Sequence, residues 1–134
     1  MPAVRALVVE DFEPIREFLL AVLRKHGGLQ IVGEASDGLE AVRKAKELQP
    51  DVVLLDIGLP TLNGIHAARQ IRTLSPQSRI IFVTHESDPE VVREALSVGV
   101  VGYVAKKNVA SDLPAAVDAV LQGRQFFSIG CTLD

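Results

Sequence analysis

The stretch that decides the fold is "DVVLLDIGLP", residues 51–60. Four consecutive apolar residues lead up to Asp56, and Gly58 and Pro60 follow it closely. A short continuous apolar run bounded by turn residues is typical of a strand that is buried on both faces, as in a parallel sheet. The aspartate at the end of such a strand is the first indication of a functional site.

Four further apolar runs are short enough to be strands. They are "RALVV" (5–9), "LQIVGEA" (29–35), "RIIFV" (79–83) and "GYVA" (102–105). Segments with helical periodicity lie between them, most clearly at residues 15–23 and 113–121. Strict alternation of strands and helices predicts an α/β fold of five βα units, with a parallel sheet between two helical layers.

Turn and capping residues support these boundaries. "HGG" at residues 26–28 is suited to end the first helix, "SDG" at 36–38 to begin the second, and "QP" at 49–50 to stop it. Asp112 stands just before the last apolar stripe, where it is expected to be the N-cap of the final helix.

Composition narrows the class of protein. A chain of 134 residues with 48% hydrophobic content is expected to form one domain. The net charge of −3 gives no basic surface for nucleic acid, so these residues alone are not expected to bind DNA. Cys131 is the single cysteine, and no apolar run approaches the length of a signal peptide core or a membrane span. We therefore expect a cytoplasmic protein with no membrane partner.

Polar residues follow four of the five predicted strands: Glu10 and Asp11 the first, Asp56 the third, Thr84 the fourth and Lys106 the fifth. In an open parallel sheet, ligands bind outside the carboxyl ends of the strands, so these side chains are expected to converge. Three neighbouring carboxylates favour a compensating cation such as Mg²⁺. A lysine and a hydroxyl beside them suit a phosphoryl group, with Asp56 as the nucleophile that forms an aspartyl phosphate.

Two enzyme-like or cofactor-binding alternatives share parts of this pattern. A phosphatase or phosphotransferase with an aspartate nucleophile usually carries it on the first strand and needs a substrate cap, and neither feature is visible. A flavin-binding flavodoxin needs a Ser/Thr-rich phosphate loop after the first strand, where this chain has "EDFEP" (10–14).

Four motifs together resemble the receiver domain of two-component response regulators. They are "VVED" (8–11), "DVVLLDIGLPTLNG" (51–64), "FVTHES" (82–87) and "GYVAK" (102–106). The resemblance implies a receiver domain over residues 1–122, with a flavodoxin-like parallel sheet of order 2-1-3-4-5. It also implies a signalling domain that assists its own phosphorylation and dephosphorylation, not an enzyme.

The resemblance assigns a role to each site residue. Asp56 would accept a phosphoryl group from a histidine kinase or phosphotransfer protein. Glu10, Asp11, Asp56 and the backbone carbonyl of Gly58 would hold Mg²⁺. Thr84 and Lys106 would bind phosphoryl oxygens. Tyr103 occupies the switch-aromatic position and would turn inward as Thr84 moves to the phosphate, which reshapes the face formed by the fourth helix, fifth strand and fifth helix.

The segments "IVGEASDGLEAV" (31–42), "GYVAK" and "GRQFFS" (123–128) are similar to the NarL/FixJ (LuxR-type) branch. Its members usually carry a C-terminal helix-turn-helix domain, so residues 123–134 are a tail or the start of a linker to an output domain absent from this chain. The resemblance thus implies control of transcription, with DNA bound only through that domain, and allows a homodimer on phosphorylation. A stand-alone receiver or phosphorelay intermediate is the alternative.

Three positions depart from the receiver pattern. His85 stands where most receivers have a small residue, so it either slows phosphotransfer to Asp56 or points to solvent. If it blocks the site, the chain is a pseudo-receiver that acts as an interaction module without phosphate, although all five site residues argue against this. Gly58 replaces a residue with a side chain and leaves the site more open. Lys107 replaces proline, so a trans peptide bond is expected after Lys106.

Overall fold

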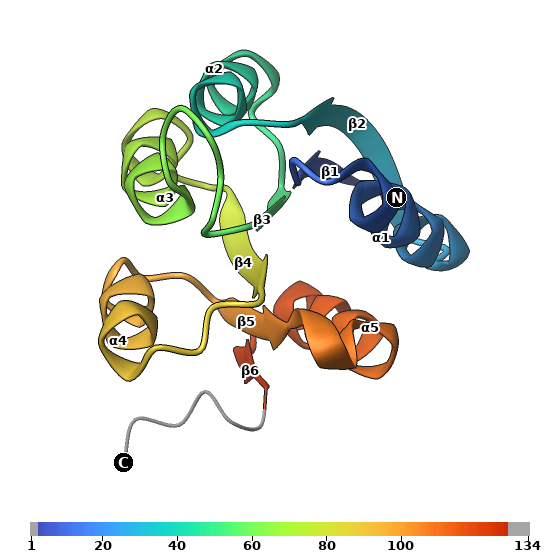
Figure 1. Ribbon diagram of the computed structural model, residues 1–134. Helices are drawn as coiled ribbons and strands as arrows, with labels where there is room; N and C mark the ends of the chain where they lie inside the picture. Colours follow the sequence, from blue (N-terminus) through green and yellow to red (C-terminus); the bar gives the residue numbers. More distant parts are fainter. Residues whose placement is uncertain (1–2, 129–134) are drawn as a thin grey trace.

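The computed structural model describes residues 3–128, which form one parallel sheet between two layers of helices (Figure 1). The strands of this described part are β1 (Val4–Val9), β2 (Leu29–Ala35), β3 (Val52–Leu55), β4 (Arg79–Thr84), β5 (Gly102–Ala105) and β6 (Phe126–Phe127). Its α-helices are α1 (Glu13–Lys25), α2 (Gly38–Leu48), α3 (Gly64–Leu74), α4 (Pro89–Ser97) and α5 (Val109–Leu121), with a 3₁₀ turn at Lys106–Asn108 before α5.

The strand order is β2-β1-β3-β4-β5-β6, and each neighbouring pair is parallel. Helices α2, α3 and α4 cover one face of the sheet, and α1 and α5 cover the other (Figure 1). The predicted flavodoxin-like fold, a three-layer sandwich of order 2-1-3-4-5, is confirmed. No helix within residues 3–128 has the length and apolar character needed to cross a bilayer.

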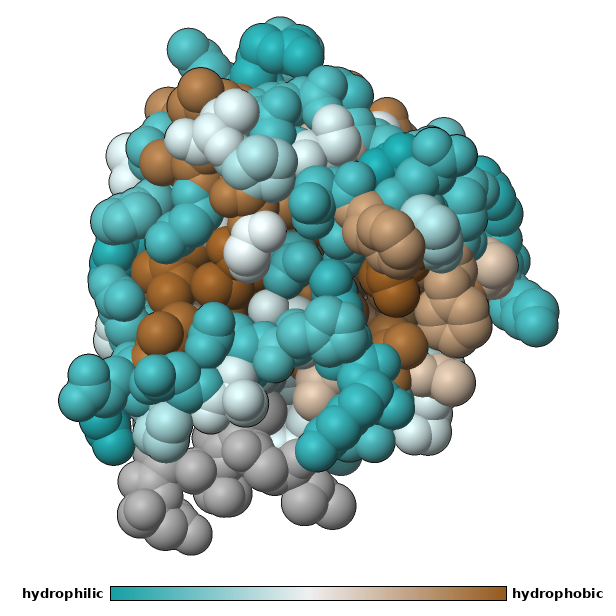
Figure 2. Space-filling model, in the orientation of Figure 1, coloured by the Kyte–Doolittle hydropathy of each residue, from teal (hydrophilic) through white to brown (hydrophobic). Residues whose placement is uncertain are grey.

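The central strand β3 explains why the sheet has two cores. All four of its residues are buried. Val53 and Leu55 belong to the core beneath α2, α3 and α4, whereas Val52 and Leu54 belong to the core beneath α1 and α5. Alternation along a strand requires this, because successive side chains point to opposite faces. The face shown in Figure 2 is mostly polar, with patches of apolar residues exposed between the polar ones.

Most predicted boundaries are confirmed. Helix α1 ends at Lys25, just before "HGG". Asp37 caps α2, since its side chain accepts a hydrogen bond from the Glu40 amide, and Gln49 ends the helix in a left-handed conformation with φ of 48°.

The prediction that Asp112 caps the last helix is wrong. The 3₁₀ turn leads directly into α5, so the helix begins at Val109 and Asn108 is its N-cap. Asp112 lies in the first helical turn, where an acidic residue is favoured by the helix dipole. Its carboxylate accepts a hydrogen bond of 2.8 Å from the Ser128 hydroxyl.

The last strand, β6, was not predicted. It pairs with β5, and Ser128 continues the contact by donating its amide to the Tyr103 carbonyl at 2.8 Å. A strand of two residues is too short for any periodicity to reveal it. The end of the domain at residue 122 stays a prediction, and residues 129–134 of the predicted tail, with Cys131, lie outside the described part.

Candidate functional site

The loops after β1, β3, β4 and β5 surround one open cavity of about 450 Å³ at the carboxyl edge of the sheet. Its lining contains all the predicted metal and phosphoryl ligands: Glu10, Asp11, Asp56, Gly58, Thr84 and Lys106. Convergence follows from the fold, because parallel strands present their carboxyl ends at the same edge. Tyr103 lies one layer deeper, within the core beneath α4.

The three acids form a compact cluster. Glu10, Asp11 and Asp56 can each direct one carboxylate oxygen so that all three lie within 4.8 Å of one another. Glu10 and Asp56 are buried, whereas Asp11 is exposed. Glu10 is held by the Phe12 amide, which donates to Oε2 at 3.0 Å. The cluster therefore has two fixed carboxylates and one that faces water.

Lys106 is the cation that this cluster holds. Its Nζ donates to Asp56 Oδ2 at 2.8 Å and lies 2.5 Å from Glu10 Oε1. Desolvation by burial raises the pKa of Glu10, and the nearby Asp56 charge adds to this, although Lys106 and the Phe12 amide oppose it. Burial by itself would lower the pKa of Lys106, but its hydrogen bond to Asp56 and its close contact with Glu10 raise that pKa above the ordinary value of 10.5. Lys106 is thus charged at neutral pH.

The donor set fits a small divalent cation. Glu10 Oε1 is buried, and its close contact with Lys106 is not directed as a hydrogen bond, so this oxygen has coordination capacity left. Carboxylate oxygens are the hard ligands that Mg²⁺ prefers, and the open cavity leaves room for the waters that the ion retains. Two carboxylates per lysine also leave an excess of negative charge for a metal to neutralise.

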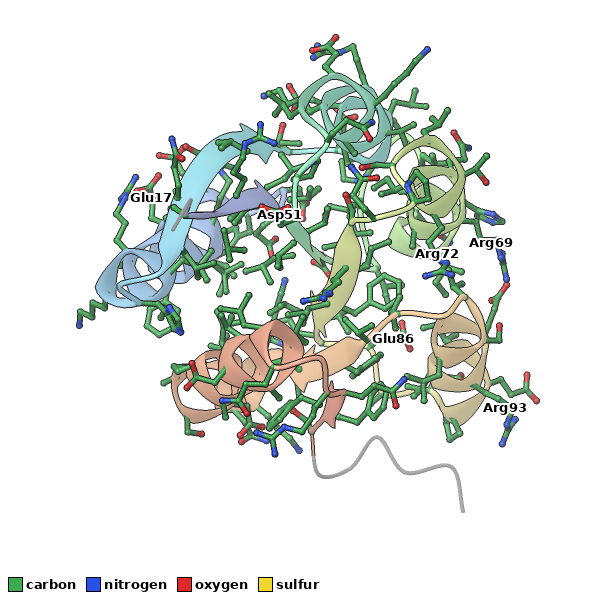
Figure 3. All side chains as sticks on the ribbon, turned by 180° about the vertical axis from the view of Figure 1, so that it is seen from behind. Glu17, Asp51, Arg69, Arg72, Glu86 and Arg93 are labelled. Carbon is green, nitrogen blue, oxygen red and sulfur yellow. The ribbon has the colours of Figure 1, made fainter. Side chains whose placement is uncertain are left out.

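Thr84 and Tyr103 both contact the backbone of one residue in the β4–α4 loop, Glu86. The Glu86 amide donates to Thr84 Oγ1 at 3.2 Å, and the Tyr103 hydroxyl donates to the Glu86 carbonyl at 2.8 Å. Figure 3 shows Glu86 beside β5 and α4. Tyr103 is 1% exposed, and its ring packs edge-on against Phe82 with centroids 6.3 Å apart. A backbone segment of one residue therefore joins the strand-end hydroxyl to the aromatic side chain.

Two of the three positions that depart from the receiver pattern, Gly58 and His85, line the cavity. His85 is exposed and lines the mouth, so its effect on phosphotransfer stays a prediction. Gly58 has open space around it, since a Cβ there would meet no atom within 4 Å. The peptide bond after Lys106 is trans, as predicted, since the described residues contain no cis bond.

Sequence reasoning missed residues that contact the site residues or their loops from outside the cavity. The Arg16 guanidinium donates to the Glu10 carbonyl at 2.8 Å and pairs with Glu34 at 3.2 Å. Thr61 binds the Asp37 carboxylate at 3.0 Å. Polar residues are common on exposed helix faces and in loops. Neither Arg16 on its helix nor Thr61 in its loop therefore stands out in the sequence. From the sequence, Asp37 is identified only as part of "SDG", the turn that begins α2.

A flavodoxin-like sheet that gathers three carboxylates, a threonine and a lysine at its carboxyl edge has the architecture of a receiver-type signalling domain. The chain belongs to the response regulator receiver domain family, whose model matches residues 6–118. The predicted resemblance to receivers of the NarL/FixJ (LuxR-type) branch is confirmed by the relatives below, and the family is a signalling module rather than an enzyme.

Individual relatives agree with this assignment. The chain is 36% identical over 126 residues to the response regulator GacA of Pseudomonas viridiflava, covering 93% of this chain and 58% of GacA. It is 35% identical over 120 residues to the transcriptional regulatory protein LiaR of Bacillus subtilis, covering 90% of this chain and 57% of LiaR. The crystal structure of a LuxR-family two-component response regulator from Aurantimonas sp. SI85-9A1 superposes with a TM-score of 0.89 and 32% identity, covering 96% and 92% of the two chains.

Proposed function

We propose that this receiver accepts a phosphoryl group on Asp56 from a histidine kinase or phosphotransfer protein. Glu10, Asp11, Asp56 and the backbone carbonyl of Gly58 would hold Mg²⁺, and Thr84 and Lys106 would bind phosphoryl oxygens. The observation that carries the proposal is the contact of Lys106 with both buried carboxylates, at 2.8 Å and 2.5 Å. This contact supports the proposal, because a fixed positive charge lies beside the carboxylate that would act as the nucleophile.

Charge neutralisation is the main chemical task of such a site. A carboxylate and a phosphoryl group repel each other, so transfer depends on cations that offset the negative charge of both. Lys106 is anchored by its hydrogen bond to Asp56 Oδ2, while Asp56 Oδ1 accepts a weaker bond of 3.3 Å from the Gly58 amide. Bound Mg²⁺ would supply the remaining positive charge. The exposed Asp11 keeps one side of the cluster open to it.

The backbone of Glu86 connects the site to the α4–β5–α5 face, because it is bonded to both Thr84 and Tyr103. If Thr84 turns its hydroxyl toward a phosphoryl oxygen, the Glu86 amide loses its acceptor, and the loop that Tyr103 holds through the Glu86 carbonyl can rearrange. Phosphorylation would then shift the population of arrangements on the α4–β5–α5 face. Tyr103→Phe, which keeps the ring and removes this bond, should leave phosphorylation intact. It should reduce the change in amide exchange on that face.

An output function is inferred from the relatives. The chain spans less than two thirds of the length of GacA and LiaR, and LiaR is a transcriptional regulatory protein. We infer that the receiver controls transcription in the cytoplasm through an output domain beyond these residues, which would make the DNA contacts. The net charge of −3 supports this assignment, in which the receiver accepts the phosphoryl group and a separate domain binds DNA.

The test is incubation with acetyl phosphate and Mg²⁺, followed by intact-mass measurement. Wild type should gain one phosphoryl group, and Asp56→Asn should gain none. Asp51→Asn is the matched control, because Asp51 is an exposed aspartate one strand length earlier, and it should behave as wild type. No gain on wild type would indicate a pseudo-receiver, and an equal gain on Asp56→Asn would place the acceptor elsewhere. Either result contradicts the proposal.

A further inference from the structure

The loop between β3 and α3, which follows Asp56 and contains Gly58, is anchored on the N-terminus of α2. The Gly38 amide donates to the Pro60 carbonyl at 3.1 Å, and the Leu39 amide donates to Thr61 Oγ1 at 3.2 Å. The first amides of a helix have no acceptor within the helix. The loop supplies acceptors for two of them, so α2 and the Asp56 loop stabilise each other.

Thr61 makes this contact in an unusual backbone conformation. Its φ is 65°, in the left-handed region that β-branched residues rarely adopt. Such a conformation persists only where the surroundings determine it, and it is found preferentially at functional sites. Here the Thr61 hydroxyl is used twice: it accepts from Leu39 and donates to Asp37 Oδ1 at 3.0 Å. A glycine would adopt this φ without strain, but it would offer no hydroxyl.

Close backbone packing fixes both ends of the same loop. A Cβ on Gly38 would lie 1.8 Å from the Leu62 carbonyl oxygen, and a Cβ on Gly64 would lie 1.9 Å from the Asp56 carbonyl oxygen. The Gly64 amide also donates to the Ile57 carbonyl at 2.7 Å. Between these fixed points Gly58 has free space and lines the acid cavity. The Thr61 contact is therefore a side-chain restraint on a loop whose ends the backbone already holds.

We propose that Thr61 is a positioning residue for the metal site: its hydroxyl, held between Asp37 and the Leu39 amide, fixes the loop that presents Gly58 beside Glu10, Asp11 and Asp56, and so sets the affinity for Mg²⁺. This inference rests on the proposed function, because it takes that acid cluster as the Mg²⁺ site. Thr61 itself contacts neither metal nor phosphoryl group. It acts through the backbone of residues 57–60.

The experiment is a calorimetric titration of the folded protein with Mg²⁺ alone, without a phosphodonor. Thr61→Ala removes the hydroxyl and should weaken Mg²⁺ binding about tenfold, the lower end of the range for losing a residue that orients metal ligands. Thr61→Ser keeps the hydroxyl and should retain wild-type affinity. Thr73→Ala is the matched control, because Thr73 is an exposed threonine on α3, and it should also match wild type.

Each outcome bears on the proposal. An unchanged Mg²⁺ affinity of Thr61→Ala, with only a lower melting temperature in EDTA, would mean that Thr61 merely supports the fold and would overturn the inference. So would a Thr61→Ser variant as weak as Thr61→Ala. If Thr61→Ala does not fold, Thr61→Gly replaces it, since it relieves the strain but still lacks the hydroxyl, and it should bind Mg²⁺ more weakly.

The proposed metal site has its own control, Asp11→Asn. If wild type and Asp11→Asn bind Mg²⁺ equally, or wild type binds none, the metal site itself is wrong and the inference falls with it. If Asp11→Asn weakens binding and Thr61→Ala does not, only the positioning role of Thr61 is overturned.

Discussion

Replacing Lys106 with methionine should destabilise the metal-free domain by about 3 kcal/mol. Methionine keeps an apolar stem of similar length but leaves Glu10 and Asp56 without the ammonium that contacts both of them. Removing one partner of a buried ion pair costs roughly 3–5 kcal/mol. We take the lower end, because the cavity beside the pair admits water and because Glu10, whose pKa is already raised, can take up a proton.

The loss should depend on pH and on Mg²⁺. At acidic pH Glu10, whose pKa is raised by burial, takes up a proton, so the difference between Lys106→Met and wild type should shrink. At neutral pH, Mg²⁺ should restore part of the lost stability, because a ligand that binds only the folded state stabilises it. In wild type, the folded-state pKa of Lys106 lies above 10.5. On the alkaline side, its contribution to stability is therefore present from neutral pH up to 10.5 and is lost as the pH rises through the folded-state pKa.

Urea denaturation followed by circular dichroism in EDTA measures the effect. Lys107→Met is the matched control, since Lys107 is the next residue and is exposed, and it should change the unfolding free energy by less than about 0.5 kcal/mol. A Lys106→Met variant as stable as wild type at neutral pH, or an equal loss in Lys107→Met, would refute the reasoning that two buried carboxylates depend on this one cation.

Three further predictions concern the loops around the site. Gly64→Ala should destabilise the domain by about 3 kcal/mol, the upper end for overpacking, because its Cβ would lie 1.9 Å from the Asp56 carbonyl oxygen. Gly58→Ala is the control: its Cβ would meet no atom within 4 Å, so it should be nearly neutral in the same urea titrations. The pKa of Asp37 lies below its ordinary value of 3.8, because the Glu40 amide and then the Thr61 hydroxyl bond its charged form. Its stabilising effect is therefore present above pH 3.8 and lost as the pH falls through the folded-state pKa, so Asp37→Asn should flatten the melting temperature against pH in that range; an unaltered profile would exclude this role. His85→Ala should accept phosphate from acetyl phosphate faster than wild type if the imidazole narrows the mouth, and unchanged phosphorylation and hydrolysis rates would remove that hypothesis.

The fold was predictable because its strongest signals are local. The apolar run at residues 52–55, bounded by turn residues, is typical of a strand buried on both faces, and the alternation around it left few topologies. Asp112 misled because an acidic residue suits both an N-cap and the first helical turn, and only the 3₁₀ turn before α5 decides between them. Strand β6 forms because it pairs with β5, and its own two residues are too few to show a strand pattern.

The sequence could predict which residues gather at the site, but not which of their side chains contact one another. Parallel strands carry their carboxyl ends to one edge, so Asp56, Thr84 and Lys106 could be brought together without coordinates. That Lys106 reaches across to Glu10 as well as Asp56 depends on side-chain reach between strands. The bond between Thr61 and Asp37 joins residues 24 positions apart and requires the α2 terminus to lie against the Asp56 loop, which no sequence pattern encodes.

Locating the modified residue tests the central claim most directly. Borohydride reduces the acyl phosphate of a phosphorylated aspartate to homoserine, which marks the acceptor in a peptide map. After incubation with acetyl phosphate and Mg²⁺, wild type should contain homoserine at position 56 alone, and omission of Mg²⁺ should abolish it. Homoserine at another aspartate, or none at position 56, would contradict the assignment of Asp56 as the phosphoryl acceptor.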